Sequence, residues 1–497
     1  MTITAARPAA IGAPPSPMSI VLSLARFEGR KTVTHPLVWV GALGAAGMAI
    51  FELREQAPVL NRVSVTLAWT MLPLAAAVAL VAGWAALRAR GRTDAHPPVI
   101  LPVAISQRVG GIVTGLLWPA LGTLLLQMVL LGWVSTRDPV TSLVWTELLV
   151  GPVYIIFAGA LGAALTRWLP HTATPLFAVL GLGALMVAFP YDQSKWGLSI
   201  GPEWLMPLAW PQDIIPYEVA FRPAGRHLLY VASLVLVLSG LAVLGRARLG
   251  WAVLAFGLVG AVMSGSSQLG PIPENQRVEA MNRLVGDTAE LTCETHSGVR
   301  YCAMPGYEAW IKHWAQVTEP VLNAAPTAAV TGIEIRQYPV HNTFLLDGDD
   351  QTYNDWWWFT PTYEDYAERG AVAVGSMLAE WEGVSWVAGL GPTIVGCEPW
   401  KDCPGEAQRV AVTWLLVQYP RVQSYTVNDP TWGTEHASVA DCMIKELWAK
   451  SDAASIVLDN WDQLTALETT YEEAGAILGV SVPTGYDQNG ILVGGCP

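Results

Sequence analysis

The chain has 497 residues, of which 52% are hydrophobic and only 14% are charged, whereas ordinary soluble domains carry about 25% charged residues. Residues 1–268 hold 17 Lys and Arg against 10 Asp and Glu, and residues 269–497 hold 11 against 31. An apolar, slightly basic half therefore precedes an acidic, water-soluble half. This division excludes a disordered chain, a coiled coil and a DNA-binding protein, so no nucleic-acid partner is expected.

The first 35 residues contain no cleavable signal peptide by composition. Residues 1–17 are rich in Ala and Pro and lack an apolar run, so we expect a disordered cytoplasmic tail. Residues 18–35 mix apolar Ile20, Leu24 and Phe27 with basic residues. This mixture predicts an interfacial helix whose basic face lies among the lipid headgroups.

Seven apolar stretches within a transmembrane domain of residues 36–269 approach the roughly 20 residues that a membrane-spanning helix needs. They are residues 37–53, 66–87, 112–133, 148–166, 175–191, 228–244 and 249–269. Their interiors contain no Asp, Glu, Lys or Arg, which argues against a proton-driven transporter or a voltage sensor. Basic residues are denser before the first stretch and in every second loop, so we expect a cytoplasmic N-terminus. Seven crossings would then place residues 270–497 outside the cytoplasm.

Residues 24–39 read LARFEGRKTVTHPLVW. This stretch resembles the elbow helix and the His-Pro pair that open the ABC-2 class of ABC-transporter permeases, and two further motifs fit the same class. Residues 88–110 end with Leu101-Pro102 and Ser106-x-Arg108, like the loop that carries the coupling helix of the family. The proline-rich residues 192–227 stand where ABC-2 exporters have short re-entrant helices. The resemblance covers residues 18–248. The family has six spans with both ends cytoplasmic, so the seventh span and residues 270–497 lie outside the resemblance.

The resemblance implies a separate ATPase subunit on the cytoplasmic side. The residues expected to contact it are Arg26, Glu28, Arg30, Lys31, Arg88, Arg90, Arg92, Leu101, Pro102, Ser106 and Arg108. The chain lacks the G-x-x-x-x-G-K-[S/T] loop that binds nucleotide phosphates, so ATP and Mg are expected on the partner and no cofactor in this chain. A second permease subunit, identical or related, is expected beside it in the membrane lipid.

All six cysteines lie in the acidic half, which indicates disulfides and an extracytoplasmic location, with buried free thiols as the alternative. Short loops close at the lowest entropic cost. The expected pairs are Cys293 with Cys302, Cys397 with Cys403, and Cys442 with Cys496.

Residues 270–497 are expected to form an α+β or mostly-α domain. The expected helices are 274–286, 306–324, 363–382, 406–418, 438–450 and 462–478, and the expected strands are 299–303, 332–337 and 491–493. The aromatic run Trp356, Trp357, Trp358 and Phe359 either packs in a core or forms a ligand surface. No metal-binding or nucleophile motif occurs, so we expect neither a metal site nor catalytic residues.

These observations lead to one main hypothesis and two alternatives. The first is the permease subunit of an ABC exporter in the cell membrane, because uncharged spans suit a hydrophobic or amphiphilic cargo such as a drug, a lipid or a peptide antibiotic. The second is a mechanotransmitter that relays ATPase motion to the extracytoplasmic domain. The third is a membrane-anchored binding protein or receptor, for which seven spans exceed what anchoring requires.

Overall fold

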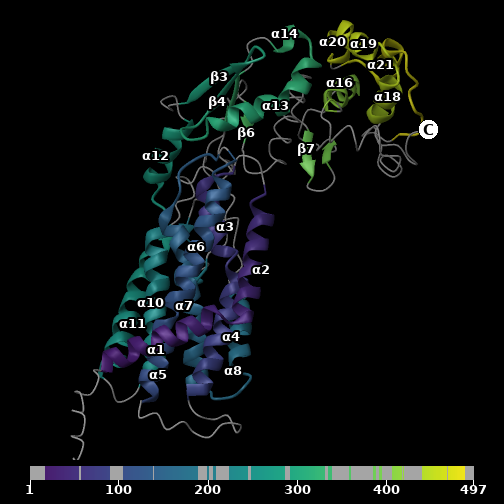
Figure 1. The fold of residues 1–497 in the computed structure, drawn as a ribbon. Coiled ribbons are helices and arrows are strands. Elements are labelled where there is room, and N and C mark those ends of the chain that lie inside the picture. Colours follow the sequence, from purple (N-terminus) through teal and green to yellow (C-terminus); the bar gives the residue numbers. More distant parts are fainter. Residues whose placement is uncertain are drawn as a thin grey trace, which may run out of the picture. The chain divides into compact units, whose positions relative to one another are not determined.

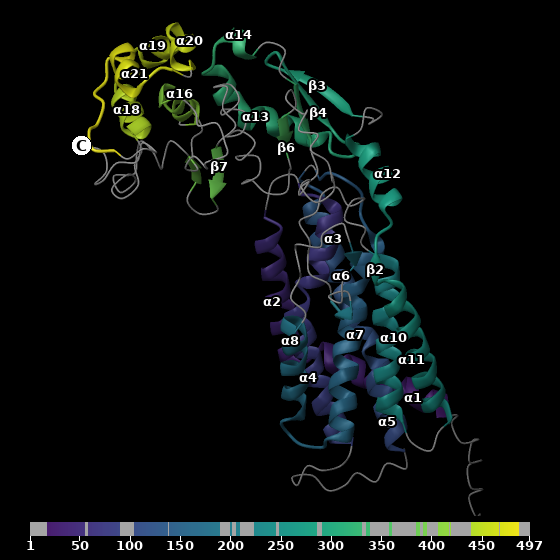
Figure 2. The same ribbon diagram turned by 180° about the vertical axis from the view of Figure 1, so that it is seen from behind.

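The computed structural model divides into two compact units (Figures 1 and 2). The helical unit comprises Met1–Arg54 and Pro58–Val278, and the second unit comprises Glu55–Ala57 and Glu279–Pro497. The structure describes residues 17–54, 58–89, 104–137, 139–188, 199–200, 205–208, 223–244, 248–285, 291–330, 334–337, 357–359, 384–387, 391–394, 406–416, 418, 439–466 and 468–486. Each unit is described by itself below.

The helical unit is built mainly from helices. They are α1 (Pro17–Val33), α2 (Pro36–Glu52), α3 (Leu60–Trp69), α4 (Leu72–Ala89), α5 (Ile105–Gly115), α6 (Leu117–Val134), α7 (Trp145–Trp168), α8 (Thr174–Ala188), α10 (Ala224–Val243) and α11 (Arg248–Ser267). Within the described residues, five spans are long and apolar enough to cross a membrane, namely α3 with α4, α5 with α6, α7, α10 and α11. The number rises to six if α1 and α2, which meet at a 60° bend, form one span.

The described residues thus account for five or six of the seven expected crossings, and the expected span 175–191 extends beyond the described part of α8. Each predicted stretch lies on a helix, but α8 is described over only 15 residues. The helix α2 has 17 residues and counts toward a span only together with α1.

Helices α3, α7 and α10 begin before the predicted apolar stretches and include a charged residue there, whereas the interiors of the stretches remain uncharged. The helix α7 begins at Trp145, three residues before the predicted span, and so includes Glu147. Only 2% of Glu147 is exposed. Helix α3 likewise includes Arg62, and α10 includes Arg226. Because these residues lie in first turns, a hydropathy pattern centred on the apolar run misses them.

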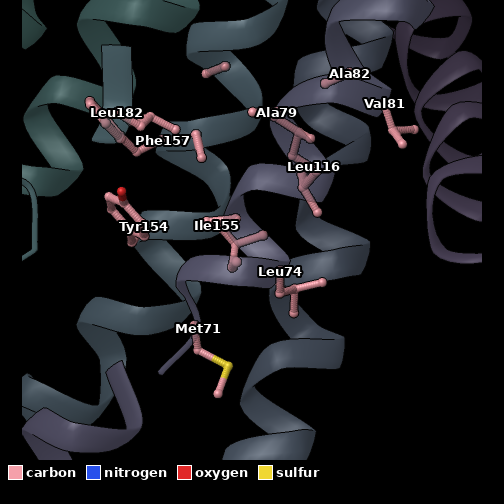
Figure 3. Close-up of a cluster of buried hydrophobic side chains, with 14 of the residues drawn as sticks. Met71, Leu74, Ala79, Val81, Ala82, Leu116, Tyr154, Ile155, Phe157 and Leu182 are labelled. Carbon is pink, nitrogen blue, oxygen red and sulfur yellow. The ribbon is translucent and has the colours of Figure 1, made fainter. Parts of the chain in front are cut away.

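The core of the helical unit forms around α7, which packs against α3, α4, α5, α6, α8 and α10. Figure 3 shows part of this core, where Tyr154, Ile155 and Phe157 of α7 lie among buried side chains of neighbouring helices. Met206 and Leu208 belong to the same buried cluster. A piece of the proline-rich region expected to be re-entrant thus enters the bundle. Residues 189–198, 201–204 and 209–222 of this region lie outside the described residues.

The second unit contains a four-stranded sheet of order β3 (Thr292–His296), β4 (Val299–Ala303), β5 (Glu334–Gln337) and β6 (Trp357–Phe359). The strands β3 and β4 form an antiparallel hairpin, and the other two pairs are parallel. Helix α13 (Ala309–Asn323) follows β4 and packs against it. Its side chains Trp310 and Trp314 are fully buried with Tyr301 of β4. Burial of these three large side chains therefore stabilises the packing of α13 on the sheet.

The remaining elements are short. They are β1 (Ser199–Ile200), β2 (Gly270–Pro271), α12 (Glu274–Val285), α14 (Thr327–Val330), β7 (Val384–Val387), β8 (Gly391–Ile394), α16 (Glu406–Leu416), α18 (Val439–Trp448), α19 (Ala453–Asp459), α20 (Trp461–Leu464) and α21 (Tyr471–Leu478). The expected helix over residues 462–478 is divided into α20 and α21. Thr470 and Glu473 form a capping box that starts α21, and such a box marks a helix N-terminus. The expected helix 363–382 and strand 491–493 lie outside the described residues.

Candidate functional site

One end of the helical unit concentrates basic residues, and we call it the basic end (lower end in Figure 1). It contains α1, the C-termini of α4, α7 and α10, and the N-termini of α5 and α11. Its described basic residues are Arg26, Arg30, Lys31, Arg88, Arg108, Arg167 and Arg248, and its described acidic residue is Glu28. The opposite end carries Arg54, Arg62, Arg137 and Arg226, together with Glu52 and Glu147.

Helix α1 lies against α5 and the start of α6 through small residues. Gly29 approaches Gly115 so closely that a Cβ on Gly115 would lie 3.0 Å from the Gly29 nitrogen and from the Ala25 carbonyl oxygen. A Cβ on Gly111 would lie 2.5 Å from the Leu24 Cβ. Ala25, Gly29 and Thr32, which recur at helical spacing, are the buried residues of α1. This contact fixes the rotation of α1 about its own axis. The remaining sides of the helix therefore face away from α5 and α6.

Those outward faces divide into a basic and an apolar strip. Arg26 and Arg30, one turn apart, are exposed on one side. Phe27 is 62% exposed on another side, and Lys31 lies 6.0 Å from its ring centroid. A helix with one protein-facing side, one apolar strip and one basic strip fits a membrane interface. Glu28 is half-buried between the protein-facing and apolar sides.

The junction of α1 and α2 follows from the His-Pro pair. His35 is extended and acts as N-cap of α2, since its Nδ1 accepts a hydrogen bond of 3.2 Å from the Leu37 N–H. Pro36 occupies the first position of α2, where its missing N–H costs nothing. The chain therefore turns by 60° between the two helices. The pair noted in the sequence thus sets the direction of α1.

The residues expected in the coupling loop are described only in part. Arg88 is exposed in the last turn of α4. Ser106 is half-buried in the first turn of α5, and Arg108 donates a hydrogen bond of 3.2 Å to the Ala89 carbonyl. The structure therefore places Arg88 and Arg108 at one end with α1. Arg90, Arg92, Leu101 and Pro102 lie outside the described residues.

Sequence analysis missed a buried glutamine in α6. The Gln127 side chain is fully buried, and its Nε2 donates a hydrogen bond of 3.2 Å to the Leu67 carbonyl at the end of α3. Gly151 of α7 provides the space, because the Gln127 amide lies against its Cα. The only sequence signal was a polar amide in an otherwise largely apolar stretch. Its partner stands 60 residues away.

In the second unit, the Cys293–Cys302 disulfide is present and joins facing positions of β3 and β4. Cys442 of α18 is also disulfide-bonded. Cys397, Cys403 and Cys496 lie outside the described residues. The predicted pairing is thus confirmed for the first pair.

The aromatic run is partly placed. Trp357, Trp358 and Phe359 form β6, which pairs with β5, and Trp356 lies outside the described residues. Backbone pairing with β5 therefore holds these three residues in the sheet. The described residues contain no group of three His, Cys, Asp or Glu side chains that could hold a metal ion.

Burial changes the acidity of two tyrosines in the second unit. It raises the pKa of Tyr301 to about 12, although the hydrogen bond to Thr318 opposes this rise. The Tyr301 hydroxyl lies 2.6 Å from the Thr318 Oγ1. Burial also raises the pKa of Tyr471 to about 12, and nearby Arg409 opposes the rise. Both phenols are neutral, structural groups at physiological pH.

The two units define the class of the protein as a helical membrane protein with an additional α+β unit that contains a disulfide. A search of protein-family models, curated proteins and solved structures found no match.

Proposed function

We propose that this chain is the permease subunit of an ABC exporter that moves a hydrophobic or amphiphilic compound. In this proposal the basic end faces the cytoplasm and contacts a separate ATPase subunit, which holds ATP and Mg. A second permease subunit completes the membrane assembly, and the second unit is extracytoplasmic.

The observation that carries the proposal is the position of α1. This helix turns away from α2 at His35, packs against α5, and presents Arg26 and Arg30 at the same end as Arg88. Exposed cations at one end of a bundle form a surface that suits a water-soluble partner with acidic groups. An isolated membrane anchor would have no need for such a surface.

The distribution of charge supports the proposed orientation. Seven basic residues against one acidic residue stand at the described basic end, and four against two at the opposite end. Cytoplasmic loops carry an excess of Lys and Arg. The Cys293–Cys302 disulfide supports an oxidising, extracytoplasmic environment for the second unit.

A mechanotransmitter is the second candidate, and α11 is the observation that favours it. This helix runs uninterrupted from Arg248 at the basic end to Ser267 at the opposite end. In sequence it is followed by the short strand β2, by α12 and then by the second unit. A continuous helix between an ATPase surface and a folded unit can transmit motion along its axis.

The test is co-purification from native membranes, followed by identification of a bound ATP-binding cassette subunit and measurement of ATP turnover. Reversal of charge in an Arg26→Glu, Arg30→Glu double variant should reduce both association and turnover at least about tenfold. Arg54→Glu is the matched control, because Arg54 is an exposed arginine at the opposite end. Wild-type association in the double variant would refute the assigned surface.

Transport into inverted vesicles then separates the two candidates. Accumulation of an amphiphilic probe that depends on ATP supports the exporter. ATP turnover that changes protease protection of the second unit, without accumulation, supports the mechanotransmitter.

A further inference from the structure

Four arginines in the helical unit hydrogen-bond to the carbonyl groups at the C-terminus of another helix. They are Arg108 at α4 (Ala89), Arg137 at α2 (Leu53 and Arg54), Arg167 at α10 (Ala242 and Leu244), and Arg226 at α11 (Ser267). The last carbonyls of a helix lack partners within it, and the negative end of the helix dipole favours a cation. In each case, therefore, an arginine joins two segments of the bundle.

The contact at α10 is the most extensive of the four. Arg167, in the last turn of α7, donates to the carbonyls of Ala242 and Leu244 through its two terminal nitrogens. The adjacent Trp168 donates from its indole nitrogen to the Leu241 carbonyl at 3.1 Å. Two consecutive residues of α7 thus hold three carbonyls at the end of α10.

Helix α10 in turn is packed tightly against α11. A Cβ on Gly240 would lie 2.7 Å from the Leu254 nitrogen, and a Cβ on Gly257 would lie 2.6 Å from the Val237 nitrogen. Backbone contact at two levels makes α10 and α11 a close hairpin. Most of α11's remaining surface is exposed and apolar, as at Phe256 with 73% and Val262 with 69%. The hairpin therefore relies on α10 for its attachment to the bundle.

We propose that Arg167 and Trp168 form a clamp that makes the basic end of the α10–α11 hairpin move together with α7. Arg167 is a positioning residue in this proposal, which rests on the proposed function for its role in an ATP-driven cycle. Motion that the ATPase imposes at the basic end then reaches α11 through the clamp. From α11 it continues along the sequence toward the second unit.

The chemistry of the clamp requires arginine in particular. The planar guanidinium donates two parallel N–H groups and stays charged at any physiological pH. Lysine carries the same charge but has no fixed fork, so it can hold one carbonyl well and the second poorly. Arg167→Lys should therefore restore only part of the function lost in Arg167→Gln.

The experiment measures the distance between spin labels at Thr172, just after α7, and at Leu249, in the first turn of α11. Both positions are exposed. The full chain is reconstituted in lipid nanodiscs, alone and with the ATPase subunit, and a chain without the two added cysteines gives the background. Arg167→Gln and Arg167→Lys are compared with Arg137→Gln, which removes an equivalent cap at the opposite end. Trp168→Phe removes only the indole N–H donor. It provides an independent test of the clamp if Arg167→Gln fails to fold.

The wild-type protein should give one narrow distance distribution that is the same without nucleotide and with ATP. Arg167→Gln should broaden it about twofold, because a released helix end samples more positions, and Arg167→Lys and Trp168→Phe should give intermediate widths. Arg137→Gln should leave it narrow. A narrow distribution in both Arg167→Gln and Trp168→Phe, or equal broadening in Arg137→Gln, would overturn the clamp.

The two proposals fail in distinguishable ways. A wild-type distance that changes with ATP would overturn the clamp while leaving the ATP-driven function intact. If no ATPase subunit associates, the proposed function fails, and the comparison of Arg167→Gln with Arg137→Gln in the chain alone still decides whether the clamp exists.

Discussion

Replacing Gly29 with alanine should displace α1 from the bundle. A Cβ at this position would contact the Trp118 ring and would lie 2.8 Å from the Gly115 carbonyl oxygen. The ring can turn because Trp118 is 51% exposed, but the carbonyl belongs to the backbone of α5 and cannot. Overpacking of this kind costs about 1–3 kcal/mol, whereas alanine in place of a helical glycine gains about 1 kcal/mol. The net loss should therefore reach up to about 2 kcal/mol.

Gly122 of α6 provides the matched control, because a Cβ there would meet no atom within 4 Å. Gly122→Ala should keep or raise the melting temperature of the protein in nanodiscs. Gly29→Ala should lower it by a few degrees, at about 2–4 °C per kcal/mol. Trypsin cleavage after Arg30 and Lys31 should also accelerate in Gly29→Ala. Equal shifts in the two variants would refute the close approach of α1 and α5.

Three further predictions concern single interactions. Gln127→Leu should destabilise the helical unit by about 0.5–1.5 kcal/mol, because the buried Leu67 carbonyl loses one of two donors and keeps the 3.3 Å bond from the Thr70 hydroxyl, and thermal unfolding in nanodiscs measures this loss. Cys302→Ser should free the thiol of Cys293, and it should lower the stability of the second unit by about 2–3 kcal/mol; mass spectrometry of non-reduced peptides and urea unfolding check the two effects. Burial raises the pKa of Tyr301 from 10.0 to about 12. Its stabilising contribution should therefore be full below pH 10 and should decline between about pH 10 and 12, because the unfolded phenol ionises at lower pH than the folded one. Absorbance of the tyrosinate anion during alkaline unfolding tests whether this phenol ionises as the second unit unfolds.

Local signals in the sequence were sufficient for features that depend on neighbouring residues. The His35-Pro36 pair marked the start of α2, and the short Cys293–Cys302 loop matched a hairpin disulfide. Residues 299–303 form β4 over the predicted range. In each of these features the interacting groups stand close together along the chain.

Features that depend on distant partners could not be predicted in the same way. The bond from Gln127 to Leu67 and the clamp at Arg167 join residues 60 or more positions apart. Glu147 was missed because a hydropathy window begins where the apolar run begins, not where the helix begins. The capping box formed by Thr470 and Glu473 starts α21 inside the predicted helix 462–478, because it satisfies backbone N–H groups locally where the apolar periodicity continues.

The close approach of α1 and α5 has an evolutionary consequence. Ala25 and Gly29 on one helix face Gly111 and Gly115 on the other, each pair four residues apart. In any lineage that retains this packing, Gly29, Gly111 and Gly115 should remain glycine, because a Cβ at each of them would lie 3.0 Å or less from an atom of the other helix. Ala25 should be replaced only by glycine or serine, because a larger side chain would separate the helices. Arg26 and Arg30 point away from this contact, so they are free to change together with the proposed ATPase subunit. A small-residue pattern at constant spacing, combined with variable charge beside it, would therefore identify distant relatives that overall similarity does not reveal.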